Sequence, residues 1–373
     1  MTGKRYEVLD ALRGLAALAV VFFHFTQVKL APTLVPHGYL AVDFFFILSG
    51  FVVAHAYENA LQTRLSWRTF MLRRIIRLYP LALLGAMMGL AILLLKWRFF
   101  PDKVDPISGI LLSGFFNALM LPTFFGGEAS HHEIFPGNGP LWTLFFELLI
   151  NALWAWLGVR MRTWQLATAS CVSAIAVAVL SFHFHTANIG FDIATFCGGL
   201  ARVCFGFTLG VVIFRMHDRF TIPAALTAPG SLSIAMVVIF TIPCSPEMTV
   251  VYDLAAIFVL LPAIVVFGAT KLSAGRLGFT IGEFSYPGYV LHFPILLIGS
   301  GLHQVMGARL DLLIFDAILF VVVVVFAGLA ARFYDRPIRN VFFQHPPAGW
   351  ARRWRCAGVW AWAAAGVRRR RGS

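Results

Sequence analysis

A histidine and an arginine occur together in the first long apolar stretch of the chain, where ionisable side chains are costly. Arg13 and His24 are 11 residues apart, so an α-helix would place them on one face, about 16 Å apart along its axis. Imidazole can serve as a general base or as a nucleophile. The stretch therefore predicts a cation at one end of a helix and a titratable base at the other. The alternatives are a histidine bonded to a backbone carbonyl and an arginine that anchors to lipid phosphate.

Two carboxylates fall in later apolar stretches, at a depth in the expected helices similar to that of His24. Asp43 lies near the start of the stretch 39–57, and Glu147 lies near the start of 141–159. A carboxylate beside an imidazole fixes its tautomer and raises its basicity. We therefore expect Glu147, with Asp43, to orient His24 and stabilise its charge. The alternative for each carboxylate is a structural hydrogen bond between helices.

Three arginines, Arg73, Arg74 and Arg77, come directly before an apolar stretch that opens with Leu-Tyr-Pro. Arg74 and Arg77 would share a helix face, and a pair of guanidinium groups suits phosphate. The pattern predicts a site for an anionic group. The alternative is that these cations only orient the chain in a membrane.

Two further signals are weaker. His292 lies in the middle of an apolar stretch and could be catalytic or a packed polar residue. His131, His132 and Glu133 could bind a metal ion, but adjacent histidines in an exposed loop are usually solvated. We expect no metal site.

The amino-acid composition indicates the class of protein in which these residues lie. Of the 373 residues 59% are hydrophobic and only 13% are charged, whereas soluble domains carry about 25% charged residues. This excludes a soluble enzyme, a disordered chain and a disulfide scaffold. A net charge of +13 would suggest nucleic acid in a soluble protein. In a membrane protein it is an orientation signal, so no nucleic-acid partner is expected.

A spanning helix needs about 20 mostly apolar residues. Eleven stretches qualify, at 8–28, 39–57, 79–96, 107–125, 141–159, 164–182, 194–214, 224–243, 250–269, 284–302 and 310–332. The first is too long and too polar for a cleavable signal peptide. The sequence predicts an all-α polytopic membrane domain over 5–340, followed by an Arg-rich cytoplasmic tail over 341–373.

The distribution of cations favours about ten spans over eleven. If only one of the stretches 79–96 and 107–125 crosses, most of the 30 Lys and Arg residues fall on the cytoplasmic side, with both termini. The other stretch would then be re-entrant or interfacial. The sequence does not decide which one spans.

Four ordered elements resemble the acyltransferase-3 family of bacterial integral-membrane O-acyltransferases. They cover nearly the whole chain and comprise Tyr6-Glu-Val-Leu-Asp10-Ala-Leu-Arg13 with His24 and Asp43-Phe-Phe-Phe-Ile-Leu-Ser49; Arg74-Ile-Ile-Arg77-Leu-Tyr-Pro; Gly139-Pro-Leu-Trp142-Thr-Leu-Phe-Phe-Glu147; and Phe284-Ser-Tyr286-Pro-Gly-Tyr289-Val-Leu-His292. Thr143 replaces the serine usual in the third element, and Leu148-Leu-Ile-Asn151 lacks an aromatic pair that many members carry. We expect the stand-alone form of the family, without the hydrolase-like domain of its fused members.

The resemblance implies transfer of an acyl group, usually acetyl, from cytoplasmic acyl-CoA to a saccharide hydroxyl. His24 would act as a general base or carry the acyl group, with Glu147 and Asp43 supporting it. The CoA phosphates would be held by Arg13, Arg74 and Arg77, with His292 and Trp142 as additional site residues.

The acceptor would be an extracytoplasmic or lipid-linked saccharide, at the bacterial inner membrane and in contact with its lipids. The competing class is a transporter or flippase of a lipid-linked sugar or small solute. That class would be expected to show an internal repeat or paired broken helices, and the sequence has neither.

Overall fold

The computed structural model describes residues 6–28, 34–125, 132–219, 229–269, 274–306 and 312–344. Within these ranges the secondary structure is helical, apart from one isolated antiparallel bridge between Glu133 and Asp192. The predicted all-α class is therefore confirmed for the described part of the chain. The predicted tail over 341–373 lies outside the described residues from 345 onward.

Seven helical segments of the described residues are long and apolar enough to cross a membrane. They are α1 Glu7–Gln27; Gly38–Thr63, which contains α2 Ala41–Thr63; α3 Trp67–Phe99; α6 Thr163–His183; α7 Phe196–Met216; Pro246–Gly268, made of α9 Pro246–Ala255, a π-helical turn Ala256–Leu260 and α10 Leu261–Gly268; and Ile314–Phe342, which joins α12 Leu312–Ala330 through a π-helical turn Ala331–Asp335 to α13 Arg336–Gln344. The chain is thus a multi-pass membrane protein. Ten spans and cytoplasmic termini stay predictions.

The remaining helices are α4 Ile107–Ala118, α5 Leu141–Trp156, α8 Pro229–Thr241 and the 32-residue α11 Gly275–Met306. The uncertain pair of stretches can now be compared, since α3 has 33 residues and α4 only 12. A 12-residue helix is about 18 Å long, and a bilayer core is about 30 Å thick. The stretch 79–96 therefore belongs to a helix long enough to span, and 107–125 does not.

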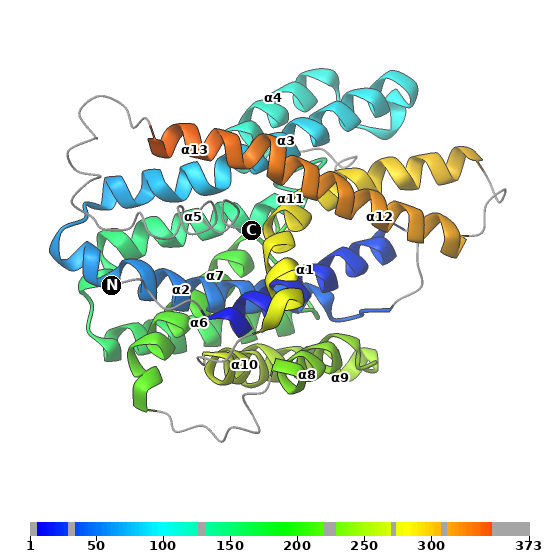
Figure 1. The fold of residues 1–373 in the computed structure, drawn as a ribbon. Coiled ribbons are helices and arrows are strands. Elements are labelled where there is room, and N and C mark those ends of the chain that lie inside the picture. Colours follow the sequence, from blue (N-terminus) through cyan, green and yellow to red (C-terminus); the bar gives the residue numbers. More distant parts are fainter. Residues whose placement is uncertain are drawn as a thin grey trace.

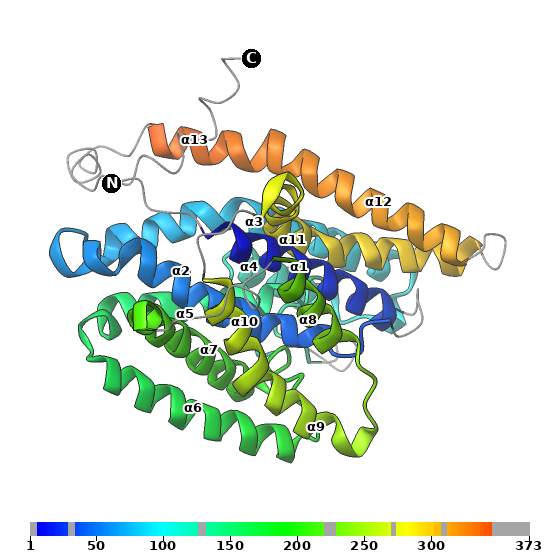
Figure 2. The same ribbon diagram turned by 60° about the horizontal axis from the view of Figure 1, so that its bottom comes forward.

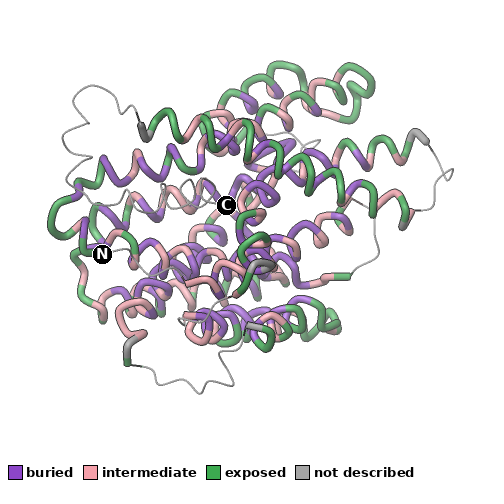
Figure 3. The backbone as a smooth tube through the Cα atoms, viewed as in Figure 1, coloured by how far each residue is buried: buried purple, intermediate pink, exposed green. Residues whose placement is uncertain are grey.

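The helices form a bundle with α1, α2, α5 and α7 towards its interior. The long C-terminal helix α12–α13 lies along α11 and α3, and α6 lies on the outside of α7 (Figures 1 and 2). The backbone of an outer helix such as α12 is largely coloured as exposed (Figure 3). Exposed apolar side chains include Ile175 on α6 and Val321 on α12, which are 66% and 57% exposed. In a membrane protein such faces contact lipid.

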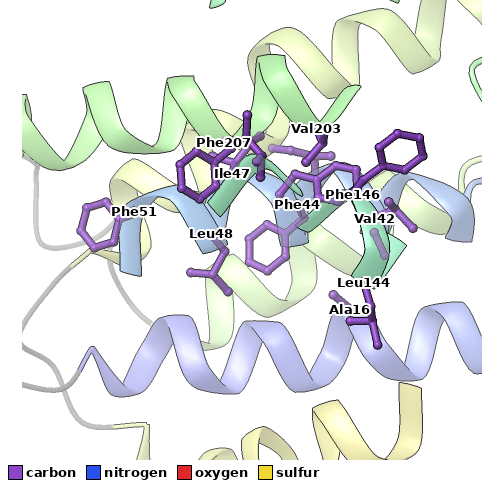
Figure 4. Packing of buried hydrophobic residues seen from close by; sticks show 14 of the residues in the cluster. Ala16, Val42, Phe44, Ile47, Leu48, Phe51, Leu144, Phe146, Val203 and Phe207 are labelled. Atoms are coloured by element: carbon purple, nitrogen blue, oxygen red, sulfur yellow. The ribbon is translucent and has the colours of Figure 1, made fainter. Parts of the chain in front are cut away.

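Aromatic and aliphatic side chains from α1, α2, α5 and α7 converge in the core. Phe44 and Ile47 of α2 lie near Val203 and Phe207 of α7, with Phe146 of α5 beside them (Figure 4). All five residues are fully or almost fully buried. The two central helices α2 and α7 are thus fixed to each other by tight apolar packing.

Glycines allow α2 and α7 to approach very closely. A Cβ atom at Gly210 of α7 would lie 2.0 Å from the carbonyl oxygen of Ile47, and one at Gly50 of α2 would lie 2.1 Å from that of Phe207. Small residues at such crossings are how membrane helices gain packing energy, because lipid supplies no hydrophobic drive between them.

We predict that Gly210→Ala destabilises the protein, because the methyl group meets backbone rather than a movable side chain. The expected loss is about 1–3 kcal/mol, measured as a lower melting temperature of the detergent-purified protein. Gly328→Ala in α12 is the matched control, since a Cβ there has nothing within 4 Å. It should gain the usual helix preference of alanine. Equal melting temperatures for the two variants would refute the close α2–α7 crossing.

Candidate active site

A cavity of about 330 Å³ opens between α1, α2, α3, α5, α11 and the C-terminal helix. Five guanidinium groups and three carboxylates line it, together with hydroxyls: Arg13, Arg74, Arg77, Arg336, Arg339, Glu147, Glu283, Asp335, Ser49, Thr143, Tyr286 and Tyr289. Arg13, Arg74 and Arg77, to which the resemblance assigned the CoA phosphates, are therefore brought together from α1 and α3, whereas Arg73 does not line the cavity. The excess of cations makes the cavity suited to an anionic ligand.

Glu147 holds Arg74 in the cavity wall. The Glu147 carboxylate accepts hydrogen bonds from the Arg74 guanidinium and, at 3.0 Å, from the Ser49 hydroxyl. The Arg74 side chain is buried, and its Nε has no hydrogen-bond partner in the described residues. A buried donor without a partner costs free energy unless a ligand satisfies it. Arg74 is thus both fixed and incompletely satisfied.

The C-terminal helix adds two arginines that sequence reasoning missed. Arg339 pairs with Asp335 at 2.7 Å, and Arg336 pairs with Glu283 of α11 at 3.1 Å. The sequence contains a signal for these two residues, since Arg336 and Arg339 have the same i, i+3 spacing as Arg74 and Arg77.

Arg13 joins the same cavity from α1. Its guanidinium lies 3.0 Å from the Asp10 carboxylate and donates to the carbonyl of Gly282 at 3.1 Å. Gly282 is itself required there, because a Cβ atom would lie 2.8 Å from the Asp10 carbonyl oxygen. The close approach of α1 and α11 therefore sets the position of Arg13.

One face of α11 connects three other helices through polar side chains at i, i+3 and i+6. Tyr286 donates to the carbonyl of Leu78 on α3. The Tyr289 hydroxyl lies 2.8 Å from that of Thr143 on α5, and His292 contacts His24 on α1 at 3.1 Å. The Tyr289 ring is a neighbour of His292, with ring centroids 6.0 Å apart. Tyr289 thus lies between the cavity and the histidine pair.

Backbone carbonyls assign the protons of this histidine pair. His292 Nδ1 lies 3.0 Å from the Gly288 carbonyl oxygen, and His24 Nδ1 lies 2.9 Å from that of Val20. A carbonyl only accepts, so both Nδ1 atoms carry the proton. The single N–H at His24 Nδ1 is then shared between the Val20 carbonyl oxygen and His292 Nε2, and His24 Nε2 keeps a lone pair. His24 is partly exposed, whereas His292 is fully buried.

The expected contact between His24 and either carboxylate is not present in the described residues. Glu147 binds Arg74 and Ser49, and both oxygens of Asp43 bind Arg202, at 3.0 and 2.7 Å. The physical reason is that a buried guanidinium needs a counter-ion more than a neutral imidazole does. The partner of His24 is the second histidine, His292.

Arg202 forms the centre of a separate buried cluster. It also donates to the carbonyls of Ile189 at 2.8 Å and Tyr39 at 3.3 Å, and Trp142 covers it, with the guanidinium carbon 5.5 Å from the ring centroid. Trp142 and Asp43 therefore support Arg202 and do not line the cavity. An arginine within an apolar stretch was the sequence signal for such a pair.

Fold and site together define a multi-pass membrane protein with a cationic cavity and a contacting histidine pair. Residues 6–333 match the family described as acyltransferase domain, and the chain belongs to this acyltransferase-3 family, as the resemblance implied.

Several curated proteins are similar to this chain. Protein 2 in the picA locus of Rhizobium radiobacter is 34% identical over 187 residues, which cover 48% of this chain and 97% of that protein. Acyltransferase MdmB of Streptomyces mycarofaciens is 26% identical, with 82% of each chain covered. Peptidoglycan O-acetyltransferase OatA of Listeria monocytogenes is 24% identical over 89% of this chain, and the chain spans 55% of OatA. No solved structure matches the chain.

We predict that Asp43→Leu and Arg202→Met each reduce the amount of folded protein, because one buried charge loses its partner, at a cost of about 3–5 kcal/mol. The double variant should recover much of this loss. The melting temperature and the yield of folded protein in detergent measure this loss of stability. A double variant as unstable as the two single variants would contradict the structural role, and a stable but inactive one would show that the charged pair itself is needed for activity.

Proposed function

We propose that this protein is an acyl-CoA-dependent O-acyltransferase that moves an acyl group, most simply acetyl, to a saccharide hydroxyl. Family membership supports acyl transfer, and a relative named as a peptidoglycan O-acetyltransferase supports a saccharide acceptor. On this proposal the chain lies in the bacterial inner membrane with the arginine cavity facing the cytoplasm, where acyl-CoA is made.

The observation that carries the proposal is the arrangement of the cavity and the histidine pair along α1. Arg13 lines the cavity, and His24 lies about 16 Å further along the same helix by helical rise. This is of the order of the length of a pantetheine arm. A donor whose phosphates bind the arginines would therefore direct its thioester towards His24.

The assigned tautomers suit general-base catalysis. His24 Nε2 can take the proton from the acceptor hydroxyl as its oxygen attacks the thioester carbonyl carbon. A carbon–oxygen bond then forms, the carbon–sulfur bond breaks, and the thiolate of CoA takes the proton from His24. His292 accepts from His24 Nδ1 and stabilises the imidazolium, the part that Glu147 and Asp43 were expected to play. A transient acyl-His24 is the alternative route.

Glu147 has a different role in this proposal from the one expected from the sequence. It holds Arg74 in the cavity wall through the ion pair and the Ser49 bond. It therefore acts as a positioning residue for the donor and not as the partner of the base.

We predict that His24→Ala abolishes acyl transfer, with a loss of at least about 100-fold, because a positioned general base contributes that much or more. The measurement is release of free CoA thiol in the presence of a saccharide acceptor, together with mass spectrometry of the product. His183→Ala, at an exposed position in α6, is the control and should be fully active. Wild-type activity in a folded His24→Ala variant would overturn the proposal.

We predict that Arg74→Ala and Arg77→Ala each raise the KM for acyl-CoA about tenfold or more, because a charge-assisted hydrogen bond to phosphate is worth about 1.5–3 kcal/mol. Arg98→Ala, at the other end of α3 and exposed, controls for loss of a cation. Titration with acetyl-CoA and with its 3′-dephospho form shows which phosphate each arginine binds. Unchanged KM values in both variants would exclude the phosphate role.

A further inference from the structure

Glu133 has a fixed position in the segment between α4 and α5. The bridge to Asp192 is made by hydrogen bonds from Ile134 N to Phe191 O and from Ile193 N to His132 O, both 3.0 Å long. Glu133 is thus not a freely solvated loop residue, contrary to what its neighbouring histidines suggest. His131, the other histidine of this sequence run, for which no metal site was expected, lies outside the described residues.

Gly139 leaves a space between this carboxylate and the histidine pair. A Cβ atom at Gly139 would lie 3.8 Å from Oε2 of Glu133 and 4.0 Å from Cε1 of Phe293. The Phe293 ring in turn packs edge-on against His24, with ring centroids 5.1 Å apart. Gly139 is thus close both to Glu133 and to the ring that packs on His24, and it leaves room there for a methyl group.

All four of these residues, His24, Phe293, Gly139 and Glu133, are partly exposed. None of them lines the arginine cavity. A substrate bound at these residues would therefore reach His24 without entering the cavity that the donor is proposed to occupy. A two-substrate transfer needs such separate routes to one base.

The residue types fit a saccharide. A sugar ring has an apolar C–H face, which packs against an aromatic ring, and hydroxyls, which donate to a carboxylate. Ligand sites combine such an apolar surface with a few placed polar groups. Phe293 and Glu133 supply one of each beside the base.

We propose that Glu133 and Phe293 form the acceptor subsite, in which the carboxylate accepts hydrogen bonds from sugar hydroxyls and the ring packs on the sugar face. Another hydroxyl of the same sugar then lies at His24. This inference rests on the proposed function and goes beyond it by naming the acceptor-binding residues.

The charge of Glu133 adds a pH dependence. Burial raises the pKa of its carboxyl to about 7; Lys96 nearby lowers it and Asp192 raises it. The ionised form, which accepts from two hydroxyls, is therefore populated above pH 7 and lost below it. The KM for the acceptor should fall as the pH rises through about 7.

The test uses the full-length protein and a panel of methyl hexosides and N-acetylhexosamine oligosaccharides, with the best wild-type acceptor then used throughout. Glu133→Gln should raise the acceptor KM about tenfold or more, since a hydrogen bond to a charged group is lost. The KM for acetyl-CoA should stay within about twofold, and the acceptor KM should no longer depend on pH near 7. Glu247→Gln, exposed on α9, is the control.

Gly139→Val is the second variant, because its Cβ meets only side-chain atoms, at 3.8 and 4.0 Å, and its two further methyl groups add bulk beside Glu133 and Phe293. It should also raise the acceptor KM and leave acetyl-CoA binding unchanged. Wild-type acceptor KM values in either folded variant would overturn the subsite while leaving the proposed function intact. If the wild-type protein acylates no sugar in the panel, the proposed function and the subsite both fail.

Discussion

The ion pair between Asp43 and Arg202 is the constraint on which the rest of the bundle depends. Both side chains are at most 1% exposed, in a part of the molecule where an isolated charge would be very costly. Arg202 also binds backbone carbonyls of Tyr39 and Ile189, and so fixes α2, α7 and the connection between α6 and α7 to one another. The network continues from Tyr39, whose hydroxyl donates to the Asp253 carboxylate, and that carboxylate also binds His37 at 2.7 Å. Rotation of α2 or α7 about its axis would break these bonds.

The site follows from that fixed frame and from the polar face of α11. With α2 in place, Ser49 reaches Glu147 of α5, which in turn holds Arg74 of α3. Tyr289 and His292 of α11 then reach Thr143 and His24. Proline helps to fix the same helix. Pro294 has no N–H for the carbonyl of Val290, and the Asn138 amide donates to that oxygen at 3.1 Å.

Much of the site could be predicted because it depends on spacing within single helices. Arg13 and His24 on α1, and Arg74 and Arg77 on α3, keep their geometry whatever the neighbours do. These residues were assigned from the sequence to two ends of one site, and the structure places the arginines together in the cavity. Their roles in binding and catalysis stay predictions.

The partners across helices could not be predicted, because they depend on how each helix is rotated. Depth alone placed Asp43 and Glu147 beside His24, yet each faces an arginine of another helix. Two further features depend on tertiary contacts: the approach of Arg339 from the far end of the chain, and the backbone bridge that holds Glu133. The span count was also difficult, since the 16-residue α5 is shorter than the apolar stretch that contains it.

The central claim is that one donor molecule extends from the arginine cavity to His24. A cryo-EM structure of the protein with a non-hydrolysable thioether analogue of acetyl-CoA tests it most directly. We expect the phosphates about 3 Å from Arg74, Arg77 or Arg339. The acyl carbon should lie beyond Tyr289, where an acceptor oxygen about 3–3.5 Å from that carbon is within reach of His24 Nε2. A nucleotide bound on the Glu133 side, or an acyl group that ends in the cavity away from His24, would contradict the account.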